Sequence, residues 1–433
     1  MTGPTPRTIA EHLTATLARV RPLEVVDVPL VEAVDALGLV LARDVAATAP
    51  VPAFDNSAMD GYAVRRSELP EDGTEVTLPV LADIRPGPTS DVVGAILGPI
   101  RPGSRDESGQ ESRPQPPGVV RIMTGAPLPA GFDAVVPVER TSTGRFVAGR
   151  PTTERTVTLA RQPRDHVRRA GTDVATGDRL ASTGGVVTAG LVAVAAAAGL
   201  TTLAVHRRPR VAVVSTGSEL AAPGSTAPGT IPDSNSLMLA ALAREAGADV
   251  VRVGAVPDDA AALTATLDHV APGVDLVVTS GGVSAGASDV VREVLATGSP
   301  TDVEIAAVAV RPGRPQALAS WRGVPWIAVP GNPVSALVSF TLFARPALRR
   351  LAGHRGAPTV RTARAAVGWP SPPGAEQVLP VVIGPDGVTP AASDGHHLSG
   401  LPAADALAVV PADVAQVSPG DEVTVHPLGE DRS

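Results

Sequence analysis

The residues best suited to chemistry lie in one stretch, DLVVTSGGVSAGASD, which runs from Asp275 to Asp289. Its apolar, β-branched start predicts a buried strand, Leu276–Val278. Small residues able to contact a ligand follow the strand: Ser280, Gly281, Gly282 and Ser284. The stretch ends on the Asp289 carboxylate, just before a helical pattern. Backbone N–H groups in such a loop can cradle an anion at the carboxyl end of a parallel strand. An ordinary turn without a ligand explains the same residues equally well.

A second stretch, RVAVVSTGSE from Arg210, repeats this order of residue types. An apolar strand over Val211–Val214 ends in Ser215, Thr216 and Gly217, and the carboxylate of Glu219 follows. Two such strand ends in one α/β unit indicate a single crevice at the edge of a sheet.

Further along the chain, two other turns could hold anions. Arg311 and Arg314 flank a Pro-Gly turn, and two guanidinium groups can fork onto phosphate or molybdate oxygens. A solvated charged turn is the alternative. In the second turn, PGNP from Pro330 to Pro333, the prolines restrict the loop that carries Asn332. Ser335 then falls in the first turn of a helix, where free N–H groups attract anions.

Polar side chains also gather earlier in the chain, in PVPAFDNSAMDGYAVR from Pro50 to Arg65. Asp55, Asn56, Ser57 and Asp60 can all form hydrogen bonds. An Asx-rich turn entering a strand is the plainer interpretation, but a turn does not need so many acceptors in a row, which favours a site.

Thr124 and Asp173 are weaker candidates for a functional site. Thr124 lies in a TGAP turn between two expected strands and has one free hydroxyl, although an ordinary hairpin connection gives the same pattern. Asp173 lies among alternating glycines and charges, and most such aspartates are turn residues.

Hydrophobic periodicity places these residues on an α/β framework. A capping box at Thr8 and Glu11 predicts the start of the first helix. Helices are expected over 8–20, 30–37, 188–198, 236–246, 290–295 and 334–351. Strands are expected over 119–123, 134–138, 157–159, 211–214, 250–256, 276–278, 303–310 and 326–329. The central order of strand and helix with short links predicts a parallel sheet with helices on both faces.

The chain has 433 residues, which predicts several domains. We expect N-terminal α+β domains, a central doubly wound parallel-sheet domain and a small C-terminal β-barrel-like domain. The expected divisions are a linker segment at 1–50 that pairs with 150–205, a β-rich domain at 51–149, the α/β domain at 206–355 and the β domain at 356–433. The β-rich domain contains a Pro-, Gly- and Ser-rich stretch near 87–118, which predicts a disordered insertion.

Composition excludes several kinds of site. The net charge is −8 and no lysine is present, which argues against nucleic acid as a partner. Cysteine is absent, so there are no disulfides, thiolate metal sites or cysteine nucleophiles. The longest apolar run, 191–200, is too short to span a membrane. The N-terminal MTGPTPRTIAEHL has no apolar signal core, and we expect a cytoplasmic protein.

Five of these motifs occur in one order along the chain: FDNSAMDGYAVR, RIMTGAPLP, VAVVSTGSEL, VVTSGGVSAGASD and VPGNPVSAL. Together they resemble the molybdopterin molybdenumtransferase family, which includes MoeA and the E domain of gephyrin. The resemblance covers nearly the whole chain except the insertion.

The resemblance implies the last step of molybdenum cofactor synthesis. Adenylylated molybdopterin is cleaved, AMP leaves, and molybdate enters the dithiolene with the help of a divalent metal such as Mg2+. The resemblance also implies a homodimer whose site takes residues from both subunits, with Asp60 and Thr124 coming from the neighbouring one.

The resemblance also assigns roles to particular residues. Catalytic positions fall on Asp60, Thr124, Asp173, Glu219, Asp258 and Asp289. Glu219, Asp258 and Asp289 are expected to shape the metal–phosphate site. Arg311 and Arg314 take the places of lysines that are common in the family, and Ser335 helps to hold the pterin.

Some family positions differ here. Ala307 stands where a lysine is common, and Pro380 with Gly395 or His396 stands where an arginine and a serine serve the incoming molybdate. Loss of such donors weakens the capture of an oxyanion, although His396 could substitute. A diverged relative that binds pterin nucleotide as a carrier or scaffold is therefore the alternative to the enzyme.

Overall fold

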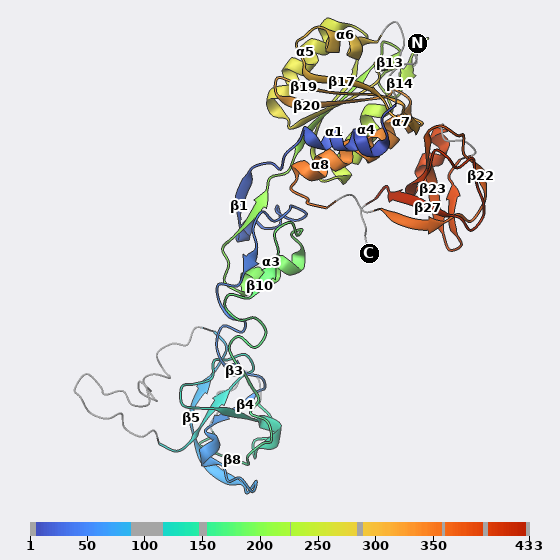
Figure 1. The fold of residues 1–433 in the computed structure, drawn as a ribbon. Helices are drawn as coiled ribbons and strands as arrows, with labels where there is room; N and C mark the ends of the chain where they lie inside the picture. Colours follow the sequence, from blue (N-terminus) through green and yellow to red (C-terminus); the bar gives the residue numbers. More distant parts are fainter. Residues whose placement is uncertain are drawn as a thin grey trace.

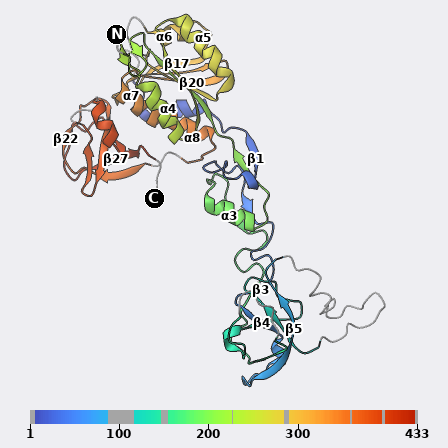
Figure 2. The same cartoon turned by 180° about the vertical axis from the view of Figure 1, so that it is seen from behind.

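The computed structural model describes residues 6–87, 116–146, 154–225, 227–283, 289–356, 360–392 and 397–429. The described chain is elongated, with an α/β body at one end, a β-rich domain at the other and a narrow linker region between them (Figure 1). A C-terminal β domain lies beside the α/β body, and the view from behind shows the same order (Figure 2). Most of the expected insertion, together with Ser284, Gly395 and His396, lies outside the described residues.

The α/β body is built on a six-stranded sheet with the strand order β15-β12-β16-β20-β19-β17. The strands are β12 Arg210–Thr216, β15 Asp249–Val256, β16 Leu276–Ser280, β17 Thr301–Ala307, β19 Pro315–Trp321 and β20 Val324–Val329. Neighbours among β15, β12, β16 and β20 are parallel, as the alternation of strand and helix predicts. Their carboxyl ends therefore meet at one edge.

Strand β19 departs from the expected parallel arrangement, because it runs antiparallel to both β20 and β17. The reason is the two-residue turn Arg322–Gly323, whose φ angles of 50° and 84° belong to a tight hairpin. The expected strand over 303–310 also ends early, at Ala307. Val310–Arg311 (β18) instead pairs with Glu376 and Gln377 of the C-terminal domain.

Helices cover both faces of this sheet, as a doubly wound fold requires. On one face α5 (Ala260–Val270) and α6 (Val290–Ala296) bury side chains such as Leu263 and Val294. The other face is covered by α1 Ile9–Ala18, α4 Asn235–Glu245, α7 Pro333–Ser339 and α8 Arg345–Leu351. The N-terminal helix thus packs on the domain that is formed much later in the chain (Figure 1). Its expected capping box is present, with Glu11 N–H donating to Thr8 Oγ1 at 3.1 Å.

Two helix predictions need correction. The helix expected over 334–351 is interrupted by a π-helical segment, η5 (Phe340–Ala344), which joins α7 to α8. Pro346 has no N–H to donate to the preceding turn, which fits the change of pitch just before it. The helix expected over 30–37 is only a 3-10 turn, η1 (Leu30–Glu32). Val31 and Val34 stay 93% and 76% exposed, and the buried side chains of Ala33 and Ala36 are small, so little apolar packing offsets the cost of helix nucleation.

The β-rich domain contains a sheet of order β7-β4-β6-β5-β8. Its strands are β4 Gly61–Val64, β5 Val76–Ile84, β6 Val119–Ile122, β7 Ala134–Pro137 and β8 Thr156–Leu159. Strand β4 lies between β6 and β7, so the turn at Thr124 does not close a hairpin between them. A small ribbon, β3 (Asn56–Ser57) with β9 (Val167–Arg168), lies at the end near the linker.

The linker region and the C-terminal domain complete the described chain. The linker holds β1 Val25–Pro29, β2 Val45–Ala46, β10 Arg179–Ala181, α3 Ala189–Ala197 and β11 Thr202–His206. The C-terminal sheet holds β18, β21 Arg361–Arg364, β23 Glu376–Gly384, β24 Gly387–Pro390, β25 Ala406–Val410 and β27 Glu422–Pro427. Two-residue strands form the pairs β13 Leu220–Ala221 with β14 Ile231–Pro232 and β22 Trp369–Pro370 with β26 Gln416–Val417. The remaining 3-10 segments are η2 Arg66–Glu68, η3 Val138–Arg140, η4 Ala271–Gly273 and η6 Leu398–Ala403. No helix among the described residues is long and apolar enough to cross a bilayer.

Candidate functional site

A cavity of about 580 Å³ lies at the carboxyl edge of the parallel strands. It is lined by the ends of β12, β16 and β20, which are the strand ends singled out in the sequence. Expected binding residues in its lining are Thr216, Gly217, Ser280, Gly281, Gly282, Pro330, Asn332 and Pro333. Ser215 is not among them, because its hydroxyl is fully buried and donates to Asp233 Oδ1 at 2.9 Å.

The glycines allow the strand ends to approach one another very closely. A Cβ atom on Gly281 would lie 2.5 Å from the carbonyl oxygen of Thr216, and one on Gly331 would lie 3.3 Å from Gly281 Cα. Gly281 also has a φ of +99°, which L side chains rarely adopt. Glycine is therefore required here both for conformation and for space.

The expectation that these loops present free N–H groups to an anion is wrong at several positions. Gly217 N–H donates to Val256 O and Gly281 N–H donates to Val329 O, each at 3.0 Å. In the first turn of α7, Asn332 Oδ1 accepts from the N–H groups of Val334 and Ser335 at 3.1 and 3.2 Å. These donors are used to hold strand and helix ends together.

Two functional candidates, Asp233 and Asn235, come directly before the helix expected over 236–246, where the sequence alone indicates only helix caps. Asp233 is 3% exposed and lines the cavity, and its carboxylate accepts from both Ser215 and Ser236. Asn235 Nδ2 donates to Ser280 Oγ at 2.8 Å and to Gly331 O at 2.7 Å, so it ties two cavity loops together. Its Oδ1 is buried without a hydrogen-bond partner among the described residues. The signal in the sequence is PDSNS, from Pro232 to Ser236, where four polar side chains follow one another although a helix needs only one N-cap.

The three carboxylates predicted to shape a metal–phosphate site, Glu219, Asp258 and Asp289, all line this cavity. Asp258 exchanges hydrogen bonds with Ser218, since Ser218 N–H donates to Asp258 Oδ2 and Asp258 N–H donates to Ser218 Oγ, both at 2.9 Å. Glu219 folds over Gly217, where a Cβ would meet its Oε2 at 2.6 Å. Within the described ranges no three acidic or histidine side chains form a ready cluster for a metal.

Asp289 differs from the other two carboxylates because it is only 6% exposed. Both of its carboxylate oxygens are buried and lack a hydrogen-bond partner in the described part of the chain. Burial raises the pKa of Asp289, whereas the nearby backbone N–H of Arg292 and then its positive charge lower it. The negative charges of Asp258 and Glu293 add to the upward shift. A buried carboxylate that has only the backbone N–H of Arg292 near it is costly for the fold, which points to a role in binding a cation or a proton.

A second hollow, of about 400 Å³, lies where the α/β body meets the C-terminal domain. It contains Arg311 and Arg314 from the RPGRP turn together with Asn332 and Ser335 from the start of α7. Asn332 lines both hollows, so they are adjacent. Basic groups therefore lie beside a cavity with an acidic lining, an arrangement suited to a ligand that carries both a bound cation and a free oxyanion.

The remaining predicted catalytic residues are not in either hollow. Thr124 donates to Asp60 Oδ1 through its N–H at 2.7 Å and through its hydroxyl at 2.8 Å, so these two residues form one pair. They belong to the β-rich domain, which lies at the opposite end of the molecule from the α/β body (Figure 1). Asp173 lies in the exposed turn beside β9, where its N–H donates to Val51 O.

The close approach of strand ends can be tested with Gly281→Ala. A Cβ at this position requires both a strained φ and a separation of the Gly281 and Thr216 backbones. We expect the free energy of unfolding to fall by about 1–3 kcal/mol more than for a substitution that only strains φ. Gly298→Ala is the matched control, since Gly298 has a φ of +78° and open space around its Cβ position. Equal melting temperatures for the two variants would contradict the close approach.

Comparison with known proteins agrees with this architecture. Residues 7–199 match the family described as MoeA N-terminal region (domain I and II), 212–350 match the probable molybdopterin binding domain, and 362–428 match the MoeA C-terminal region (domain IV). Molybdopterin molybdenumtransferase 2 of Mycobacterium tuberculosis is 40% identical over 98% of this chain and 100% of the relative. Molybdopterin molybdenumtransferase 1 of that organism is 35% identical over 92% and 93% of the two chains. The structure of a molybdopterin biosynthesis MoeA protein from Pyrococcus horikosii has a TM-score of 0.77 and 27% identity, and the match covers 98% of this chain and 99% of that one. The chain belongs to the molybdopterin molybdenumtransferase family.

Proposed function

We propose that the protein catalyses the last step of molybdenum cofactor synthesis, in which adenylylated molybdopterin loses AMP and molybdate is inserted into the dithiolene. The observation that carries the proposal is the cavity at the ends of β12, β16 and β20, with carboxylates in its lining and arginines next to it, in a chain of this family. The substrate has a phosphoanhydride to be cleaved and an oxyanion to be received. The two adjacent hollows have the charges that each part needs.

The residues fit a magnesium ion. Mg2+ typically takes one or two protein carboxylates and completes its coordination with water and substrate phosphates. Asp289, whose two buried oxygens lack partners in the described part of the chain, has the donor set that such an ion takes. We propose that Asp289 holds Mg2+ with Asp258 or Glu219. When bound, Mg2+ would neutralise the negative charge that develops on the phosphates during cleavage.

The chain's own side chains supply positioning and charge. Asn235 holds the Ser280 and Gly331 loops at a fixed separation, so that the cavity keeps its shape when empty. Arg311 and Arg314 have guanidinium groups that can bind two oxygens of an anion at once, which suits the phosphate of the pterin or the incoming molybdate. Pro380 cannot contribute there, because it is buried in β23 and has no side-chain donor.

We further propose that the active form is a homodimer in the cytoplasm. Asp60 and Thr124 lie in the β-rich domain, which the linker holds away from the α/β body of the same chain (Figure 2). A second copy can supply the pair to the cavity, as the family resemblance implies. Arrangement around a two-fold axis would give two identical sites per dimer.

The activity is tested by incubating the protein with adenylylated molybdopterin, Mg2+ and molybdate and measuring the release of AMP. We expect release by the wild type and a rate at least about tenfold lower for Glu219→Gln, because a carboxylate that faces the metal or the phosphates is neutralised. Glu245→Gln, at an exposed position of α4 outside the cavity, is the matched control and should keep the wild-type rate. Tight binding of the substrate without any release of AMP would instead identify a carrier of pterin nucleotide.

Asp289→Asn should separate stability from activity. The pKa of Asp289 is raised in the folded state, so the ionised carboxylate costs stability above that pKa, and the cost disappears as the pH falls. We expect the variant to melt at a higher temperature than the wild type at pH 7, with a difference that shrinks toward pH 4, and to lose AMP release. Asp259→Ala is the control of opposite sign, because Asp259 caps α5 by accepting from Ala262 N–H at 2.7 Å and the loss of this cap should lower the melting temperature. A lower melting temperature for Asp289→Asn at pH 7 would show that its carboxylate is stabilised in the fold.

A further inference from the structure

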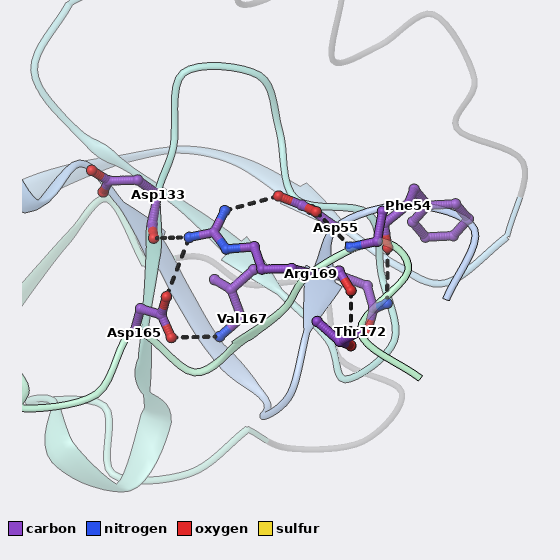
Figure 3. Close-up of polar contacts among 9 residues, drawn as sticks. Phe54, Asp55, Asp133, Asp165, Val167, Arg169 and Thr172 are labelled. Carbon is purple, nitrogen blue, oxygen red and sulfur yellow. Dashed lines mark hydrogen bonds and ion pairs between the residues drawn. The ribbon is translucent and has the colours of Figure 1, made fainter. Parts of the chain in front are cut away.

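The side chain of Arg169 draws three segments of the β-rich domain together (Figure 3). Its Nη1 donates to Asp55 Oδ2 at 2.8 Å, and its Nη2 donates to the carbonyl of Asp133 at 3.1 Å and to Asp165 Oδ2 at 3.2 Å. In Figure 3 the guanidinium lies between these three acceptors, which come from separate parts of the chain. The planar fork of arginine can serve three acceptors in fixed directions, and the point charge of lysine cannot reproduce this.

Asp55 is the member of this group that connects it to other elements. Its Oδ1 accepts from Ala170 N–H at 2.8 Å, and its backbone carbonyl accepts from Leu128 N–H at 2.8 Å. The N–H of Ala170, and then the guanidinium of Arg169, lower the pKa of Asp55. The carboxylate therefore stays ionised at neutral pH and keeps all of these bonds.

From Asp55 the hydrogen bonds continue without a break to the Asp60–Thr124 pair. Strand β3 lies between β9 and the turn after β6, since Ser57 N–H donates to Ala126 O at 3.0 Å and Gly125 N–H donates to Ser57 O at 2.8 Å. On the β9 side, Ala58 N–H donates to His166 O at 2.9 Å. The bonds from Thr124 to Asp60 join the ends of these same two segments.

Arg169 and its acceptors Asp55, Asp133 and Asp165, together called the clamp, also lie where the β-rich domain is attached to the linker. Gly171 N–H donates to Pro52 O at 3.1 Å, and Asp173 N–H donates to Val51 O at 3.0 Å. The two segments that connect the β-rich domain to the linker therefore lie side by side here. Arg169 lies just before the segment that contains Gly171 and Asp173, and Asp55 lies just after the segment that contains Val51 and Pro52. A contact at this point therefore affects both the shape of the loop from Asp55 to Asp60 and the orientation of that loop relative to the linker.

We propose that Arg169 is a positioning residue that fixes the loop of Asp55–Asp60 and thereby sets the place of Asp60 and Thr124 for the reaction. The inference rests on the proposed function for its effect on rate, whereas its effect on the loop does not depend on that function. The contribution of Arg169 to overall stability is small, because the side chains of Arg169 and Asp55 are 44% and 38% exposed and ion pairs at such exposure stabilise little. Its role is geometric.

The effect on the loop is measured by amide hydrogen exchange in the full-length protein. We expect Arg169→Gln to speed the exchange of backbone amides in segments 56–60 and 124–128, and Arg169→Lys to have an intermediate effect. Arg161→Gln is the matched control, since Arg161 forms an ion pair with Glu71 at 3.0 Å in the same domain and does not touch this loop. Unchanged exchange in Arg169→Gln overturns the proposal whether or not the protein is an enzyme.

The effect on the reaction is measured by steady-state release of AMP. Misplacement of a reacting group by about 1 Å can cost up to about 10²-fold, so we expect kcat to fall by tenfold or more in Arg169→Gln. KM for adenylylated molybdopterin should stay within about twofold, because the substrate binds in the cavity of the α/β body and the clamp does not touch it. Arg169→Lys should recover part of kcat and Arg161→Gln should have the wild-type kcat.

A double variant shows whether Arg169 acts through Asp60. If it does, Arg169→Gln combined with Asp60→Asn is no slower than Asp60→Asn alone. Multiplied losses in the double variant, or a wild-type kcat in Arg169→Gln, overturn the positioning role. Absence of AMP release from the wild type contradicts the proposed function instead, and the exchange measurement still decides whether Arg169 holds the loop.

Discussion

The site depends on a steric constraint at the ends of three neighbouring parallel strands. A Cβ added at Gly281 would overlap with the backbone of Thr216, and one added at Gly331 would crowd the backbone of Gly281. Hydrogen bonds from Gly217 to Val256 and from Gly281 to Val329 hold these ends in place, and the amide of Asn235 fastens the Ser280 and Gly331 loops. The N–H groups of Gly217 and Gly281 thus hold the floor of the cavity together and are not free to donate to an anion.

This floor leaves the chemistry to side chains, and their charges are segregated. Carboxylates line the main cavity and arginines line the adjoining hollow, with Asn332 between them. Asp289 is buried without partners among the described residues, and the fold therefore carries a cost at that position. Proteins commonly keep such costs at functional sites, because the group is needed for a ligand more than for the fold. The arrangement suits a substrate with a metal-bound phosphoanhydride at one end and an oxyanion at the other.

Much of this architecture follows from the sequence. The strand–glycine–carboxylate order at Val211 and at Leu276 correctly placed Glu219 and Asp289 in one cavity, because parallel strands that are neighbours must end at the same edge. The capping box at Thr8 and the α/β alternation also had local signals with a clear physical basis. Family membership followed from long motifs in a fixed order, and the relatives confirm it.

Other features depended on tertiary contacts that local patterns do not contain. The direction of β19 follows from the Arg322–Gly323 turn, whose significance is visible only when both flanking strands are known. Asn332 uses the N–H groups of α7 that looked free for an anion, because its side chain folds back onto them. The pairing of Asp60 with Thr124, and the contacts of Arg169 with Asp55 and Asp133, join residues that are far apart in the sequence.

The proposed function requires one site built from the cavity of one chain and the Asp60–Thr124 pair of a second copy. Complementation between two strongly impaired variants tests it most directly. Asp60→Asn and Asp289→Asn are co-expressed with different affinity tags, and the mixed dimer is purified through both tags and assayed for AMP release. A two-fold dimer contains one site with both changes and one with neither, so the account predicts recovery of about half the wild-type rate. A mixed dimer as slow as its two parents would contradict a site shared between subunits.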